Sequence, residues 1–259
     1  MPPLSRIVRS MNKAVKTKAP LDDHIKSIIF AIILAFIFRS FLFDPFHIPS
    51  SSMKDGLLVG DYLFVSKYSY GYSKYSFPFG GVLPMEGRIF EDSPKRGDVA
   101  VFRQPKNTRI DYIKRVIGLP GDRIQMKNGI LHINDVPVTR KKKADFVEMI
   151  DGRTITNTRR YTETLPNGVQ YSVLDAVQDG PVDNTFIYRV PKGHYFMMGD
   201  NRDNSQDSRF LDEVGFVPAE NLIGKAQIIV FSVEEGTAIW KFWTWPWTLR
   251  FDRFFKTID

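Results

Sequence analysis

Residues 25–53 read IKSIIFAIILAFIFRSFLFDPFHIPSSSM, an apolar run that leads within a few residues to three consecutive serines. The apolar part, residues 25–43, is 19 residues long and is interrupted only by Lys26 and Arg39. A helix needs about 20 apolar residues to cross a bilayer, and cations near its ends can extend toward the headgroups. The run therefore predicts one N-terminal transmembrane helix over residues 25–43.

The positive charge of the chain is concentrated beside this helix. Of the net charge of +7, residues 1–26 carry +4 and Arg39 adds one, which leaves +2 for the 220 residues that follow. Basic residues before a span favour the cytoplasmic side. We expect residues 1–24 to be a basic cytoplasmic tail and the chain after Asp44 to lie on the outer (periplasmic or extracytoplasmic) face of the inner or plasma membrane. Membrane lipid, rather than nucleic acid, is the partner that this charge pattern indicates.

Two other interpretations of the apolar run are weaker. A cleavable signal peptide would make Ser50-Ser51-Ser52 its small-x-small cleavage site. However, Arg39 and five phenylalanines between positions 36 and 46 separate the apolar core from those serines. A buried core helix would need a helical partner, and nothing downstream in the sequence offers one.

Composition excludes several classes of site. The chain has no cysteine, so disulfide frameworks, thiolate metal sites and cysteine nucleophiles are excluded. The 259 residues, 43% of them apolar, suffice for a real core. The acidic loop 200–211 does not fit the EF-hand frame, because Ser205 and Leu211 occupy the positions that need Gly and Glu. No phosphate-binding glycine loop is present either, so we expect no metal and no cofactor.

Beyond Asp44, short apolar runs bounded by turn residues predict strands. The predicted strands are 57–65 (one or two strands with a turn at Gly60-Asp61), 99–103, 110–117, 123–126, 130–133 and 224–233. Asn128-Gly129 and Asn167-Gly168 each predict a hairpin. Residues 66–81 hold four Tyr and two Phe, which fits equally an aromatic loop folded onto the domain or one dipping into the membrane interface. Residues 240–259 contain all four tryptophans and favour an interfacial anchor.

Serine and lysine supply the candidate chemistry. Lys114 lies among Ile110, Ile113, Val116 and Ile117. Loss of solvent there would favour a neutral amine, which can accept a serine proton. His47 or His194 is an alternative base in a Ser-His-Asp arrangement, although a lone histidine near a serine is usually ordinary structure.

Three blocks of the sequence together resemble the type I signal peptidases, or leader peptidases. They are residues 44–53 (DPFHIPSSSM), residues 96–102 (RGDVAVF) with 111–122 (DYIKRVIGLPGD), and residues 199–209 (GDNRDNSQDSR). The match in order and spacing extends from about residue 25 to residue 230, and the last block is highly specific. Many members have Gly where this chain has Ser51, a change that we expect to be tolerated. Some members also carry two transmembrane segments, whereas this chain has one candidate.

The resemblance implies a role for each matching residue. Ser52 would be the nucleophile and Lys114 its general base, with Ser50 and the Ser52 backbone amide forming the oxyanion hole. Ser205 would hydrogen-bond and orient Lys114. Supporting ion pairs would come from Asp200, Asp207, Arg209 and Arg115. Shallow apolar pockets, which admit only small side chains, would be lined or adjoined by Phe46, Ile48, Pro49, Met53, Leu57, Val101, Tyr112 and Ile113.

The predicted protein is mainly β, with an antiparallel β-sheet catalytic domain formed by residues 44–125 and 191–236. Residues 126–190 would be a smaller β-rich insertion and residues 237–259 a Trp-rich interfacial segment. The implied activity is a membrane-anchored serine endopeptidase, which removes signal peptides from exported preproteins at Ala-x-Ala-like sites through an acyl-enzyme. A specialised or self-cleaving Ser-Lys protease and a non-enzymatic, membrane-tethered binding module remain as alternatives.

Overall fold

The chain divides into two compact units, Met1–Phe38 and Arg39–Asp259. The computed structural model describes residues 21–78, 84–150, 153–237 and 242–258. In the first unit the described part is a single helix, α1 (Leu21–Phe41), whose last three residues belong to the second unit.

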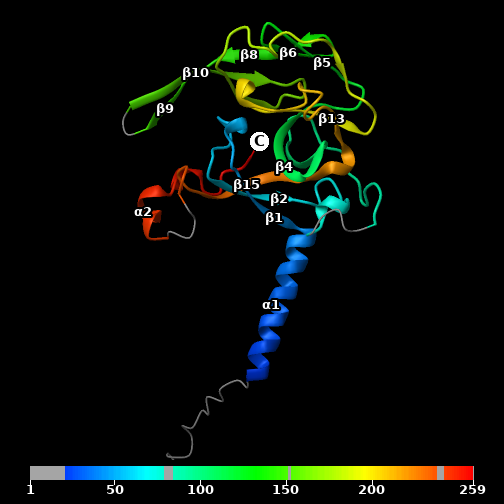
Figure 1. The fold of residues 1–259 in the computed structure, drawn as a ribbon, viewed down its shortest axis with the longest axis vertical. Coiled ribbons are helices and arrows are strands. Elements are labelled where there is room, and N and C mark those ends of the chain that lie inside the picture. Colours follow the sequence, from blue (N-terminus) through cyan, green and yellow to red (C-terminus); the bar gives the residue numbers. More distant parts are fainter. Residues whose placement is uncertain (1–20, 79–83, 151–152, 238–241, 259) are drawn as a thin grey trace, which may run out of the picture. The chain divides into compact units, whose positions relative to one another are not determined.

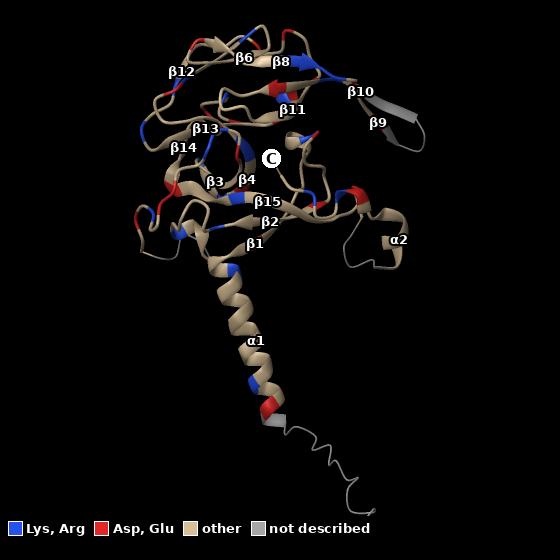
Figure 2. Ribbon diagram, turned by 180° about the vertical axis from the view of Figure 1, so that it is seen from behind, with Lys and Arg blue, Asp and Glu red and all other residues tan. Residues whose placement is uncertain are grey.

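Helix α1 is long and apolar enough to cross a membrane, with a candidate span over Asp23–Phe41. Its charged residues lie near its two ends (Figure 2). A helix that is apolar all round is typical of a span or of a protein core, and here the large apolar side chains are exposed. The helix ends at Phe41, two residues before the predicted end, because strand β1 begins at Phe43. Pro45 further disfavours helical backbone immediately before it.

A seven-stranded antiparallel sheet is the largest sheet among the described residues (Figure 1). Its strand order is β1 (Phe43–His47), β2 (Asp61–Ser66), β15 (Leu222–Ser232), β3 (Val99–Gln104), β4 (Asn107–Gly118), β13 (His194–Met198) and β14 (Val217–Pro218). Strand β4 is exposed over its first half and buried over its second. The register pairs Ala100 of β3 with Lys114 of β4, which places that lysine in the interior of the sheet.

Two four-stranded sheets are built from residues 123–189. One contains β12 (Tyr188–Arg189), β5 (Arg123–Lys127), β6 (Ile130–Ile133) and β7 (Val136–Pro137). The other contains β11 (Gln170–Asp175), β10 (Arg153–Thr164) and β8 (Thr139–Lys142), and β9 (Phe146–Ile150) pairs with β10. Strand β9 and the start of β10 form a hairpin that projects from this sheet (Figure 1). We call residues 146–150 and 153–160 the arm.

Alternation along β3 divides the core into layers. Val99 and Val101 face one cluster, which includes Ile48 and Met53 beside the three serines. Ala100 and Phe102 face a second cluster, as the two-residue period of a strand requires. A third cluster joins the buried end of β4 to the two smaller sheets. The segment that carries the serines is therefore packed directly on the core of the large sheet.

Most of the predicted local features are confirmed. Strands β5 and β6 flank Asn128-Gly129, where both residues have positive φ, the conformation that a type I′ hairpin turn requires. In the aromatic segment Tyr70 is buried in the core whereas Tyr68 is half exposed, and residues 79–83 lie outside the described residues. Contact of this segment with lipid stays a prediction. Near the C-terminus, Trp247 in the short helix α2 (Trp245–Thr248) and Trp243 just before it are exposed, and Trp240 lies outside the described residues. Contact of this segment with the membrane interface stays a prediction.

Candidate active site

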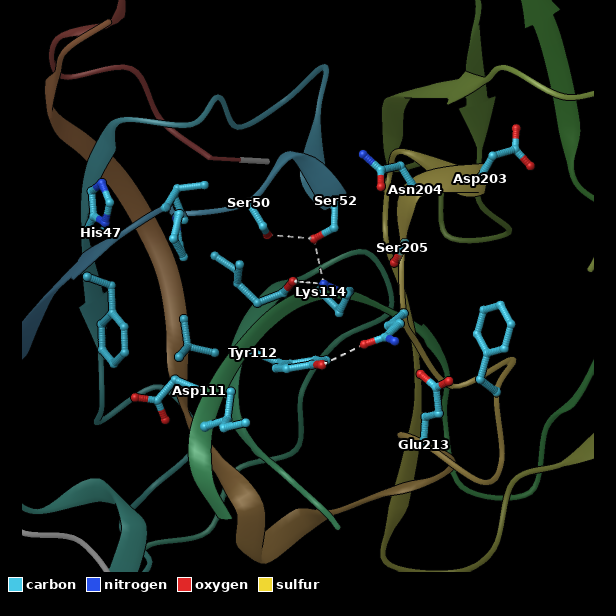
Figure 3. Close-up of a pocket in the computed structure, with 18 residues that line it drawn as sticks. His47, Ser50, Ser52, Asp111, Tyr112, Lys114, Asp203, Asn204, Ser205 and Glu213 are labelled. Carbon is cyan, nitrogen blue, oxygen red and sulfur yellow. Dashed lines mark hydrogen bonds between the residues drawn. The ribbon is translucent and has the colours of Figure 1, made fainter. Parts of the chain in front are cut away.

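Ser52 lies in a single 3-10 turn, Ser51–Met53, which the chain reaches shortly after β1. Backbone hydrogen bonds fix the approach to this turn, because the Ile48 amide donates to the Asp61 carbonyl at 2.9 Å. The Asn201 amide donates to the Ser52 carbonyl at 3.0 Å, and Met53 is buried in the core. The turn is therefore held from both sides, and the Ser52 hydroxyl points toward Lys114 (Figure 3).

Lys114 is brought to Ser52 by the buried half of β4. Its Nζ lies 2.7 Å from Ser52 Oγ and donates to the Ile113 carbonyl at 2.9 Å (Figure 3). The ring of Tyr112 lies beside the amine, with the Nζ 5.1 Å from the ring centroid. A serine hydroxyl and an amine at this distance have the geometry of a nucleophile and its general base.

Burial sets the protonation of this amine. The Lys114 side chain is only 4% exposed, and burial lowers its pKa to about 8. The carboxylates of Asp207 and Asp200 act in the opposite direction, while the nearby Arg209 charge lowers the pKa further. A fraction of the amine is therefore neutral near pH 7, and only the neutral form can take a proton from serine.

Two buried ion pairs place charges near Lys114, and their four residues are those predicted to form supporting ion pairs. Arg115 donates to both carboxylate oxygens of Asp200, at 2.9 and 2.8 Å. Arg209 donates to both oxygens of Asp207, at 2.8 and 2.9 Å. Burial works to raise the pKa of Asp207, but the Arg209 charge and hydrogen bonds keep it below the ordinary value. Bidentate pairs of this kind fix the positions of planar groups as well as their charges.

The Ser50 hydroxyl lies 3.4 Å from Ser52 Oγ on the cleft side of the turn (Figure 3). A second hydroxyl so close to the attacking oxygen is near the place where an oxyanion would form during acyl transfer. The position of Ser50 is therefore compatible with the predicted role in an oxyanion hole.

A cleft of about 800 Å³ opens in front of Ser52 and Lys114. Six of the eight predicted substrate-binding residues line it, namely Phe46, Ile48, Pro49, Val101, Tyr112 and Ile113. The other two, Met53 and Leu57, are buried and line a smaller cavity of about 150 Å³ instead. The resemblance implied that these two residues line or adjoin the substrate pockets, but the path of the chain through and after the turn carries them away from the large cleft.

Ser205 also lines the cleft, and it is buried. Within the described residues no hydrogen bond joins its hydroxyl to Lys114, so the predicted bond is not formed in this structure. The hydroxyl interacts instead with Asp207 and helps to keep the pKa of that carboxyl below its ordinary value. The two alternative histidine bases make other contacts. His47 lines the same cleft, and its ring packs at a tilt against Tyr62 with centroids 4.7 Å apart. His194 Nδ1 lies 2.9 Å from the Lys192 carbonyl.

Asparagines of the loop 199–209 make contacts to the serines that sequence reasoning missed. Asn201 Nδ2 donates to the Ser51 carbonyl at 3.1 Å, and Asn204 Nδ2 donates to the Ser51 hydroxyl at 2.6 Å. A buried pair, Arg202 with Glu163, ties the same loop to strand β10. The asparagines belong to a block that the sequence had singled out, whereas nothing near Glu163 in the sequence pointed to this partner.

Comparisons with known proteins show the family of the chain. The family model described as signal peptidase, peptidase S26, matches residues 21–231. The chain belongs to this family. Signal peptidase I of Rickettsia typhi is 39% identical over 259 residues, covering 94% of this chain and 96% of the relative. That of Rickettsia canadensis is 40% identical over 249 residues, covering 90% of this chain and 92% of the relative. A solved signal peptidase I from Enterococcus faecalis is 25% identical, with a TM-score of 0.30, and covers 52% of this chain and 97% of its own.

Membership in the signal peptidase family identifies the chain as a serine peptidase, a hydrolase. The mainly β, antiparallel fold agrees with the fold class expected from the sequence. Because the chain belongs to a family of peptidases, the alternative of a non-enzymatic binding module is excluded.

Proposed function

We propose that this chain is a membrane-anchored endopeptidase that removes N-terminal signal peptides from exported preproteins, with Ser52 as nucleophile and Lys114 as general base. The observation that carries the assignment is the 2.7 Å approach of a buried lysine amine to a serine hydroxyl at the wall of a large cleft. The family of the chain supports the substrate class, because its similar relatives are signal peptidases.

The reaction would begin with proton transfer from Ser52 Oγ to the neutral Lys114 amine. Oγ attacks the carbonyl carbon of the scissile bond, and the negative oxygen is stabilised by the Ser50 hydroxyl and the Ser52 amide. The protonated Lys114 then gives its proton to the leaving amine as the carbon–nitrogen bond breaks. Lys114 then takes a proton from a water molecule whose oxygen attacks the acyl carbon. As the ester bond to Ser52 breaks, that proton passes from Lys114 to Ser52 Oγ, which restores both residues.

The apolar side chains of the cleft support a preference for small residues. Ile48, Val101 and Ile113 line the cleft and are buried, so close packing leaves them little freedom to move aside for a large side chain. An alanine, or a residue of similar size, can contact them without moving the core. Cleavage at Ala-x-Ala-like sites is the specificity that this apolar, closely packed lining supports.

Two features of the sequence support the proposed location. Helix α1 has the length and composition of a span, and the basic residues precede it. The N-terminus would then face the cytoplasm and the catalytic unit the outer side of the membrane.

Because the chain has no cysteine, single cysteines introduced at Ser10 and at Asp145 can be labelled selectively in intact cells. Labelling of the second site alone by an impermeant maleimide is the result that this topology requires.

Incubating a preprotein with detergent-solubilised wild type, Ser52→Ala and Lys114→Ala tests the chemistry. Wild type should release the mature protein, and both variants should be inactive while keeping the wild-type circular dichroism spectrum. Cleavage by both variants would exclude the dyad. A panel of preproteins that vary at −1 and −3 separates a general signal peptidase from a specialised or self-cleaving Ser-Lys protease, because the specialist would cut only a few members.

A further inference from the structure

The Ser51–Met53 turn has little stability of its own. It is a single 3-10 turn of three residues, and the side chain of the preceding Ser50 does not cap it. Short 3-10 segments have poorer hydrogen-bond geometry than α-helices and depend on tertiary contacts for a fixed position. The position of Ser52 is therefore set by whatever holds the residues around it.

On one side the turn is held by the loop that contains Asn201 and Asn204, through the hydrogen bonds to Ser51 and Ser52 given above. On the other side, the two residues that follow the turn, Lys54 and Asp55, are both charged. Each pairs with a residue far away in the sequence. Lys54 Nζ donates to Glu148 Oε1 at 2.6 Å, and Arg160 Nη1 donates to Asp55 Oδ2 at 3.3 Å.

Both partners belong to the arm. Glu148 is on β9 and Arg160 is on β10, and these two strands pair with one another. The order of charges matches across the contact, since a cation and then an anion on the turn meet an anion and a cation on the arm. The Lys54 side chain is 12% exposed and that of Glu148 34%, so solvent screens this pair only in part.

The arm is itself firmly attached. Its last two residues, Arg159 and Arg160, already pair with β11, and from Tyr161 on strand β10 is paired with β8 as well. The pair of Arg202 with Glu163 of β10 also connects it to the loop of the asparagines. Two sets of contacts therefore hold the turn, one from the loop of the asparagines and one from the arm, and both depend on β10. A displacement of β10 would move both.

We propose that the arm is a positioning element, which holds the Ser52 turn in register with Lys114 through the pairs Lys54–Glu148 and Asp55–Arg160. The inference rests on the proposed function of Ser52 as nucleophile. It gives the inserted β region a part in catalysis without any contact between the arm and the reacting atoms. A displacement of catalytic groups of about 1 Å can reduce the rate on the order of a hundredfold, so even a smaller displacement is measurable.

Charge reversal tests the first pair. Lys54→Glu and Glu148→Lys are each expected to lower kcat roughly tenfold at unchanged KM, since substrate contacts in the cleft are not altered. The double variant Lys54→Glu/Glu148→Lys restores the pair with opposite polarity and should recover most of the wild-type kcat. Glu148→Gln, a milder change, should give a smaller loss, and thermal unfolding of each purified variant establishes that it is folded.

The matched control is Arg123→Glu, which breaks an equally short pair, 2.6 Å, between Arg123 and Asp135 in the sheet of β5 and β6. That variant should keep the wild-type kcat. The inference is overturned if folded Lys54→Glu and Glu148→Lys turn over at the wild-type rate, or if the double variant is no faster than the slower single one. Ser52→Ala, measured in parallel, separates this outcome from a failure of the proposed nucleophile, because an active Ser52→Ala would refute the nucleophile itself.

Discussion

Lys114 is the residue on which the proposed chemistry depends, and its basicity comes from its position on β4. Burial between the strands lowers its pKa from 10.5 to about 8. Below that pH the amine is protonated and cannot accept the Ser52 proton, so activity should rise with pH through the pKa.

The pH dependence of kcat/KM measures this directly. We expect the acid limb of the profile for preprotein cleavage to rise about tenfold per pH unit and to level off above an apparent pKa near 8. Burial lowers the pKa of His47 below the ordinary histidine value, so an acid limb displaced well below pH 8 that vanishes in His47→Gln would indicate a histidine base instead.

Ser50 offers a second test of the site, because its hydroxyl lies beside Ser52 Oγ at 3.4 Å. Removing one oxyanion donor typically lowers kcat by about a hundredfold or more. Ser50→Ala should show a loss of this size with little change in KM. Ser51→Ala is the matched neighbour, which loses only the hydrogen bond from Asn204, and it should lose far less activity. Equal kcat for Ser50→Ala and wild type would remove Ser50 from the oxyanion hole.

The loop 199–209 passes so close to the Ser51–Met53 turn that only glycine fits at its start. A Cβ on Gly199 would lie 2.6 Å from the Ser52 carbonyl oxygen and 2.5 Å from Ser205 Cβ. Such contacts force the loop away from the turn, together with the Asn201 amide that binds Ser52.

We therefore expect Gly199→Ala to lower kcat by an order of magnitude or more, by analogy with small displacements of catalytic groups. Gly56→Ala is its control, because a Cβ there meets its nearest neighbour at an ordinary 3.6 Å. Steady-state kinetics on both variants measures the change in kcat, and thermal unfolding verifies that each variant is folded. A fully active Gly199→Ala would mean that the loop tolerates displacement.

Local patterns in the sequence predicted the elements well, because turn chemistry and strand periodicity are local properties. The hairpin at Asn128-Gly129 and the strands around Lys114 are of this kind. Contacts between residues far apart in the sequence were not predicted. The pair of Lys54 with Glu148 joins residues 94 positions apart, and no spacing rule anticipates it. Leu57 was expected at the substrate pockets, but the path of the chain after Met53 buries it in the core.

The C-terminal segment is attached to strand β2 of the large sheet by a buried ion pair. Arg253 donates to both oxygens of the fully buried Asp61, at 2.9 and 2.6 Å, and to the Gly56 carbonyl at 2.9 Å. It thus joins the end of the chain to the segment that follows the Ser51–Met53 turn.

Arg253→Met should destabilise the protein by about 3 kcal/mol, because it removes the bidentate cation of the buried Asp61 and leaves only Arg250, whose Nη1 lies 4.0 Å from Asp61 Oδ1. Chemical denaturation of the purified enzyme measures the free energy of unfolding. Lys142→Met serves as control, since Lys142 and Asp145 form an exposed, 3.8 Å pair that should contribute less than about 1 kcal/mol. A similar, small effect of both changes would show that Arg250 alone suffices as the cationic partner of Asp61.

The conformation of the three serines also decides whether one copy of this protein can cleave another. Ser50-Ser51-Ser52 is itself a small-x-small sequence, the pattern that the proposed enzyme cuts. In the folded protein the bond after Ser52 is locked in a 3-10 turn, and both Ser52 and Met53 are buried. A protease cleft needs an extended, accessible strand, so one folded molecule cannot digest another at this point. An unfolded molecule has no such protection, and folded copies with the proposed activity would be able to cut it after Ser52, which would separate helix α1 from the rest of the chain.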